Sequence, residues 1–199
     1  MRFLAETALL DGEIRRDVAI ILDDAGRIAG VAADSDAAEG DERLRGLVVP
    51  GMPNLHSHAF QRAMAGLAER AGPEGDNFWR WREVMYRFLA VLTPEDVEAI
   101  AAQLYAECLR QGYTAVAEFH YLHNAPDGTP YADPAEMARR IAAGAEAAGI
   151  GLTLLPVLYR HSQFGGAEAA PGQRRFVLPV ETWAGICREA VSWPGVRAG

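Results

Sequence analysis

The sequence is poor in the features that build disulfide scaffolds, membrane spans and nucleic-acid surfaces. Its two cysteines, Cys108 and Cys187, lie in segments with a helical pattern and form no CxxC motif, which favours reduced thiols in the cytoplasm. No apolar run reaches the roughly 18 residues that a bilayer span requires, and the N-terminus lacks the apolar core of a signal peptide. The net charge of −8 argues against nucleic acid as a partner, because phosphate binding requires basic patches.

Several catalytic and nucleotide-binding motifs are also missing. Neither GxGxxG nor GxxxxGK[ST] occurs, so the sequence contains no recognisable loop for nucleotide phosphates. GxSxG is absent as well, which removes the nucleophile elbow of serine hydrolases. Half of the residues are hydrophobic, and 199 residues suffice for one good core but not for two large domains.

The chain changes its pattern after the first 45 residues. Short β-rich runs separated by turn residues come first and predict hairpins or a small sheet. Strands then alternate with helices, which implies parallel pairing through right-handed crossovers. Strands are expected within 46–58, 113–122 and 151–161, helices at 59–72, 76–92, 93–112, 132–150 and 179–193, and a further strand could open at 195–199.

This order predicts a small N-terminal β-domain at 1–46 and the first three β/α units of a barrel at 47–199. A complete eight-fold β/α barrel needs about 250 residues, and only about 150 remain after the β-domain. An open half-barrel would expose an apolar strand edge. We therefore expect the sequence to be a fragment.

The stretch PGMPNLHSHAFQRAM contains two of the five histidines, His56 and His58. They follow the apolar run Leu47–Val49, which is expected to be a buried strand. Side chains alternate along a strand, so both imidazoles should lie on the same side. Two neutral imidazoles that converge form a partial metal site. The alternative is a pair of polar loop residues that fall close together by chance.

The next predicted strand ends in EFHYLHN and carries further candidates. Glu118 and His120 are two residues apart and could share a face, with Glu118 either a partner of a histidine or an ordinary ion-paired residue. Tyr121 could be a half-buried rim aromatic with its hydroxyl in water. His123 is expected in a solvated loop.

Three more polar side chains are candidates for ligand contact. Arg160, after the third strand, could bind a carboxylate in fork geometry, although a surface position is slightly favoured. Arg82 lies among aromatic residues whose commoner role is packing, but it could reach an anionic ligand. Gln61 follows His58 within one helical turn and could present its amide to a substrate.

The blocks NLHSHAFQRAM and AEFHY, supported by FWRWREVMYR, YADPAE and GQRRF, resemble the amidohydrolase superfamily and, more narrowly, formimidoylglutamate deiminases. The His-x-His alone indicates only the superfamily. The resemblance implies an α/β fold: the N-terminal part of a metal-dependent hydrolase (β/α)8 TIM-like barrel, incomplete in this chain and preceded by a small β-sandwich-type domain.

The same resemblance implies one Zn²⁺ held by His56 and His58, with Gln61, Arg82 and Tyr121 facing the substrate. The remaining metal ligands and the catalytic residues are expected beyond Gly199. The implied activity is hydrolytic deimination of the small molecule N-formimino-L-glutamate in histidine degradation, without a nucleic-acid or membrane partner. A homodimer is left open for the full-length protein. The alternatives are a related deaminase that acts on a cyclic amidine such as guanine, and a non-catalytic truncated module.

Overall fold

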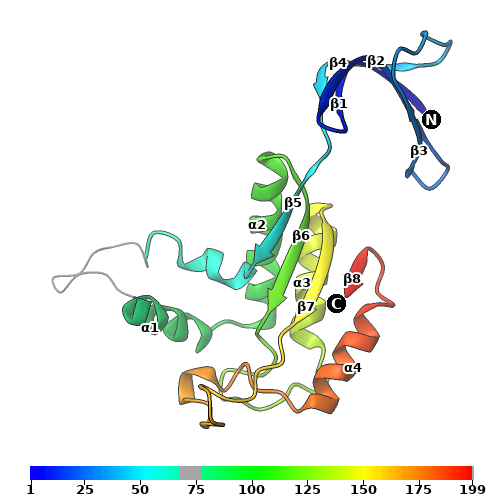
Figure 1. Cartoon of the computed structure of the whole chain (residues 1–199). Coiled ribbons are helices and arrows are strands. Elements are labelled where there is room, and N and C mark those ends of the chain that lie inside the picture. The colour runs from blue at the N-terminus through cyan, green and yellow to red at the C-terminus, as the bar shows by residue number, and fades with distance from the viewer. Residues whose placement is uncertain (68–77, 199) are drawn as a thin grey trace. The chain divides into compact units, whose positions relative to one another are not determined.

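The computed structural model describes residues 1–67 and 78–198, which form two compact units, Met1–Gly51 and Met52–Gly199 (Figure 1). Each unit contains one four-stranded sheet. Among the described residues, no helix combines the length and apolarity needed to cross a membrane.

The first unit is a mixed sheet with the strand order β3-β2-β1-β4. β1 and β2 form an antiparallel hairpin whose turn residues, Asp11 and Gly12, both have positive φ, as a tight two-residue hairpin turn requires. Ala5, Ala8 and Val18 form its small core. The expected β-domain is thus represented by a single sheet in the described residues. Its strands are β1 (Arg2–Leu10), β2 (Glu13–Leu22), β3 (Ile28–Ala32) and β4 (Glu42–Val48).

The expectation that Leu47–Val49 forms the buried strand before the histidine pair is wrong. β4 includes Leu47 and Val48 and pairs in parallel with β1 in the first unit. Leu47 and Val49 are 50% and 54% exposed. The strand that leads into the histidines is instead β5 (Met52–Ser57), and the compact units divide after Gly51. A short apolar run predicts a strand but does not specify the sheet that it joins.

The second unit is built on a parallel sheet in the order β5-β6-β7-β8. Helices connect consecutive strands, and Figure 1 shows α2 and α3 packed along one face of this sheet. This is the β/α alternation expected from the sequence. The other strands are β6 (Tyr113–His120), β7 (Gly151–Pro156) and β8 (Val196–Ala198), and the helices are α1 (Phe78–Leu89), α2 (Pro94–Arg110), α3 (Glu136–Ala148) and α4 (Val180–Ala190).

The helix expected at 59–72 is the least accurate of these predictions. The structure has a short 3-10 helix, η1 (Ala59–Met64), and residues 68–72 of the expected helix lie outside the described residues. α2 follows its sequence signals more closely. Thr93 caps its N-terminus through a reciprocal pair of hydrogen bonds with Asp96, and Gly112 follows its end with a positive φ, as capping boxes and terminal glycines predict.

A buried carboxylate ties β6 to α2 and to the turn after β5. Glu118 accepts hydrogen bonds from the Ala59 N–H (2.7 Å) and from the Tyr105 hydroxyl (3.1 Å). Both Glu118 and Tyr105 are buried. Burial raises the pKa of the Glu118 carboxyl to about 7, against the opposing effect of these hydrogen bonds. Glu118 therefore holds the residue that directly follows His58, and its partners are a backbone amide and a phenol, not the histidine or ion pair considered from the sequence.

α2 and α3 approach closely at Gly144. A Cβ atom added at this position would lie 2.9 Å from the Ala101 Cβ and 2.9 Å from the Glu98 carbonyl oxygen. Both atoms belong to α2, and the second is backbone that cannot rotate away. The residue at position 144 therefore sets the spacing between the two helices.

We expect Gly144→Ala to lower the free energy of unfolding by about 1–3 kcal/mol, because overpacking outweighs the gain in helix propensity. Gly185→Ala in α4 is the matched control, since an added Cβ there meets nothing within 4 Å. It should be neutral or stabilise by up to about 1 kcal/mol. Urea denaturation of both variants tests this, and equal effects would contradict the close approach at Gly144.

Glu118 should make stability fall as the pH rises. Its pKa is about 7 in the folded protein against an ordinary value of 4.5, so the folded state retains a proton that the unfolded state has lost. The contribution of Glu118 to the free energy of unfolding should therefore decrease between about pH 5 and pH 7, while the lowered pKa values of His58, His120 and His123 contribute in the opposite direction. Glu118→Gln should remove this contribution, so that the slope of the free energy of unfolding against pH becomes more positive than in the wild type, as denaturation curves across that range would show.

Glu107→Gln is the control for this measurement. Its hydrogen bond to Arg62 lowers the pKa of the partly exposed Glu107 carboxyl to about 2, so this group titrates below the window in both states. An unchanged slope in Glu118→Gln would show that Glu118 is ionised in the folded protein throughout that range.

Candidate functional site

The two histidines of the His-x-His motif converge at the carboxyl end of β5. Their Nε2 atoms lie 3.0 Å apart, and the rings meet edge to face with centroids separated by 4.8 Å. The intervening Ser57 is buried on the other side of the chain. Strand alternation thus puts both imidazoles on one side, as the sequence predicts.

The second ring nitrogen of His58 is held by the backbone of β6. His58 Nδ1 lies 3.0 Å from the Phe119 carbonyl oxygen, and because a carbonyl only accepts, Nδ1 carries the hydrogen. Nε2 is then left with its lone pair directed at His56. Burial lowers the pKa of the His58 imidazole, and the neighbouring His56 lowers it further. A neutral imidazole with a fixed tautomer is the form that binds a metal ion.

Phe119 also supports the other histidine. The His56 ring stacks on the Phe119 ring with centroids 4.7 Å apart and an angle of 25° between the planes. The His56 backbone N–H donates to Asn54 Oδ1 (3.2 Å). One residue of β6 therefore orients both histidines, the first through its ring and the second through its carbonyl.

The imidazoles of His56 and His58 are donors that fit zinc. Two neutral imidazoles are common ligands of Zn²⁺ and also suit other transition metals. Across residues 1–67 and 78–198, no group of three or more histidine, cysteine or carboxylate side chains is placed to hold a metal ion. The described residues thus bring together two potential ligands, and a metal site would need more.

Tyr121 extends the site away from the histidines. Its ring lies 5.2 Å from the His58 ring and 5.6 Å from the Phe176 ring, with Tyr159 on a third side at 6.4 Å. The strand has ended at His120, so Tyr121 is free to adopt this orientation. It is half-buried, as a rim aromatic would be, and packs directly against the metal-site candidate.

Arg82 stands at the far end of this row of rings. Its Nε donates a hydrogen bond to the Tyr86 hydroxyl, and its guanidinium carbon lies 5.3 Å from the centre of the Tyr86 ring. The Tyr86 ring in turn lies 6.5 Å from Phe176. The structure therefore connects Arg82 to Tyr121 and the histidine pair through a continuous aromatic wall.

The other sequence candidates are placed less decisively. Gln61 lies in η1, is half-buried, and its backbone N–H donates to the His58 carbonyl (2.9 Å), which puts it one turn after the pair. Its side-chain role stays a prediction. Arg160 is exposed, in agreement with the surface position favoured from the sequence.

The prediction that His123 lies in a solvated loop is wrong. His123 is 2% exposed, its ring meets that of His120 at 5.2 Å, and its Nε2 lies 3.1 Å from the Val157 carbonyl oxygen. Burial lowers its pKa to about 4. The backbone N–H groups of His123 and Asn124 both donate to the Arg175 carbonyl. Because Arg175 comes much later in the chain, no local pattern in EFHYLHN signals this burial.

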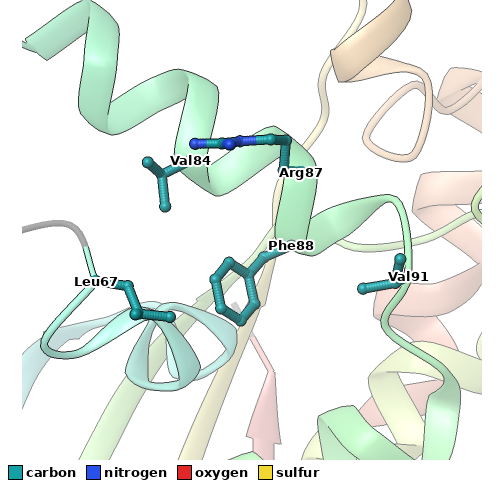
Figure 2. A pocket seen from close by; sticks show the side chains of 5 residues that line it. All are labelled: Leu67, Val84, Arg87, Phe88 and Val91. Carbon is teal, nitrogen blue, oxygen red and sulfur yellow. The ribbon is translucent and has the colours of Figure 1, made fainter.

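A separate apolar groove of about 390 Å³ lies along α1, lined by Leu67, Val84, Arg87, Phe88 and Val91. Figure 2 shows Val84 and Phe88 projecting from α1 on the side where Leu67 lies. None of the predicted metal or substrate residues lines this groove. The candidate site is therefore the histidine pair with its aromatic wall, and not this groove.

A search against models of protein families finds no match. Among curated proteins, the formimidoylglutamate deiminase of Pseudomonas aeruginosa is 61% identical over 179 residues, which are 90% of this chain and 39% of that protein. The chain thus spans about two fifths of the length of this relative.

Solved structures agree with this likeness. An amidohydrolase from Brucella melitensis superposes over the whole chain with a TM-score of 0.91 and 50% identity, and 45% of that protein is covered. Atrazine chlorohydrolase from Arthrobacter aurescens, solved with zinc, has a TM-score of 0.73 at 18% identity, with the same coverage, and shows the fold alone. Over nearly its whole length the chain is thus similar to a formimidoylglutamate deiminase, and its α/β fold matches part of the amidohydrolase barrel.

Proposed function

We propose that the protein to which this chain contributes hydrolyses N-formimino-L-glutamate to N-formyl-L-glutamate and ammonia. The observation that carries the proposal is the pair of Nε2 atoms 3.0 Å apart, with His58 fixed by the Phe119 carbonyl. It lies at the carboxyl end of a parallel strand, where active sites of this kind of barrel form. The identity of 61% to a deiminase supports this substrate class.

His56 and His58 are the residues that would hold the metal, which we propose to be one Zn²⁺ per site. Bound zinc supplies a Lewis acid and lowers the pKa of water to about 7. The Phe119 carbonyl keeps the Nδ1 hydrogen of His58 in place, so its Nε2 lone pair is available at neutral pH. The stacked Phe119 ring limits rotation of His56 in the same way.

Arg82 would bind a substrate carboxylate at the other end of the aromatic wall. A guanidinium offers two parallel N–H donors to a carboxylate, and N-formimino-L-glutamate has two carboxylates. Tyr121 lies between this anchor and the histidines, and Gln61 would present its amide from η1. Departure of ammonia also requires a general acid, which we assign to the segment beyond Gly199 together with the remaining metal ligands.

The setting and organisation follow from the same proposal. The substrate belongs to histidine degradation, and the free cysteines Cys108 and Cys187 fit a cytoplasmic location. We also propose that β5, β6 and β7 with their helices are the first three β/α units of the eight-fold barrel.

His58→Ala should abolish zinc retention and ammonia release in the complete gene product that contains residues 1–199. Loss of one ligand removes the metal, and the rate should fall by roughly 10³-fold or more. Zinc per subunit after dialysis and ammonia release from N-formimino-L-glutamate are the two measurements.

His161→Ala is the control, because this histidine is exposed. A His58→Ala protein that keeps stoichiometric zinc would refute the assignment, and wild-type release of ammonia from guanine instead would favour the cyclic-amidine alternative.

Arg82→Ala should lower kcat/KM for N-formimino-L-glutamate by roughly 100-fold, as expected for loss of a charge-assisted hydrogen bond. Zinc content should not change, because Arg82 lies at the opposite end of the wall from the histidines. Arg87→Ala, at an exposed position of the same helix, should retain normal kinetics. If Arg82→Ala loses zinc while turnover per zinc stays constant, the anchor role is wrong.

A further inference from the structure

Arg175 is a fully buried arginine that contacts the end of the helix carrying Arg82. It is 1% exposed, and its Nη1 donates to the carbonyl oxygens of Leu89 and Leu92 (2.9 Å for Leu92). Leu89 is the last residue of α1. A cation at a helix C-terminus satisfies carbonyls that have no partner within the helix and complements the helix dipole. Arg175 thus fixes one end of α1.

The same side chain also holds the loop that carries Tyr121. Arg175 Nε donates to the Asn124 carbonyl oxygen (2.8 Å), and the Arg175 carbonyl accepts from the N–H groups of His123 (2.9 Å) and Asn124 (3.0 Å). The Asn124 amide donates onward to the Val177 carbonyl oxygen (2.8 Å). One planar guanidinium therefore joins α1 to the loop after β6.

Neighbours of Arg175 in the segment Gly172–Phe176, here called the brace segment, press on the aromatic wall. A Cβ at Gly172 would lie 2.6 Å from the Tyr86 ring, so the backbone there rests directly against the residue that binds Arg82. The Phe176 ring lies between those of Tyr86 and Tyr121, at 6.5 Å and 5.6 Å. The brace segment thus contacts Tyr86, which neighbours Arg82, and Tyr121, which neighbours His58.

We propose that Arg175 is a positioning residue that sets the separation between Arg82 and the histidine pair, and with it the chain length of the substrate that is accepted. The inference rests on the proposed function. Arg82 moves with α1, and Tyr121 moves with the loop after β6. Since the brace segment bonds to both, it fixes how far a carboxylate bound at Arg82 lies from the reacting carbon at the histidines. A misplacement of about 1 Å at such a distance can cost 100-fold in rate.

The test uses substrates that differ by one methylene, N-formimino-L-glutamate and N-formimino-L-aspartate, in the complete gene product. One methylene is worth about 10- to 200-fold in discrimination. In Arg175→Lys, a single ammonium keeps the charge but cannot reach both α1 and Asn124 as a fork does. We expect the ratio of kcat/KM for the two substrates to fall about tenfold, with zinc content unchanged. Gly172→Ala, which displaces Tyr86 from the other side, should act in the same direction and serves if Arg175→Lys does not fold.

Arg174→Lys is the matched control. Arg174 is the adjacent residue but is exposed, and its Nε donates to the Pro126 carbonyl oxygen outside the wall. Its substrate ratio should stay within about twofold of the wild type. Equal losses on both substrates in Arg175→Lys and Gly172→Ala would reveal a general structural defect and overturn the inference, as would an unchanged ratio.

Amide hydrogen exchange separates this inference from the proposed function, because it needs no substrate. In Arg175→Lys, protection should fall together at Leu92 and at His123 and Asn124. If the wild type releases no ammonia from either compound, the proposed function fails, while coupled deprotection still supports the brace between α1 and the loop. Deprotection at one end only would overturn it.

Discussion

The alternation of side chains along β6 is the constraint on which the site depends. Glu118 is buried and hydrogen-bonded to Tyr105 of α2, whereas the next residue, Phe119, contacts both histidines. Glu118 holds the residue after His58, and the Phe119 carbonyl holds His58 itself. Because β5 and β6 pair in parallel, their carboxyl ends meet, and both sets of contacts act on the same turn. The histidine pair is therefore positioned by a neighbouring strand more than by its own.

The chemistry and the mechanical support of this site are divided between different parts of the chain. The proposed metal ligands lie at the carboxyl end of β5, Tyr121 follows β6, and Arg82 lies on α1. The brace segment comes after β7, and it bonds to the loop that carries Tyr121 and to the end of α1. Such a division lets a rigid sheet hold the reacting end while a separately anchored helix sets the distance to the carboxylate end. The aromatic rings between the sheet and this helix are closely packed, so a shift of one ring displaces its neighbours.

Features with a local cause could be predicted from the sequence. Thr93 and Gly112 mark the ends of α2 because capping depends on neighbouring residues, and His56 and His58 share a side because strands alternate. Features with a distant partner could not. Leu47 and Val48 pair with β1, and His123 is buried because Arg175 folds onto its backbone. The roles of Glu118 and Arg175 likewise depend on contacts with Ala59, Tyr105, Leu89 and Asn124, which are separated from them in sequence.

The support that His58 receives from Phe119 comes from the main chain, and this affects how the site tolerates sequence change. Every residue at position 119 provides a carbonyl oxygen, so substitution there would alter the stacking on His56 but leave the tautomer of His58 intact. The orientation of His58 therefore depends on the backbone register of β6 and not on the side chain at position 119. An insertion or deletion within β6 would move a different carbonyl opposite His58 and also reverse which side chains face the helices. Sequence drift in this strand should therefore be tolerated as substitutions and rejected as changes in length.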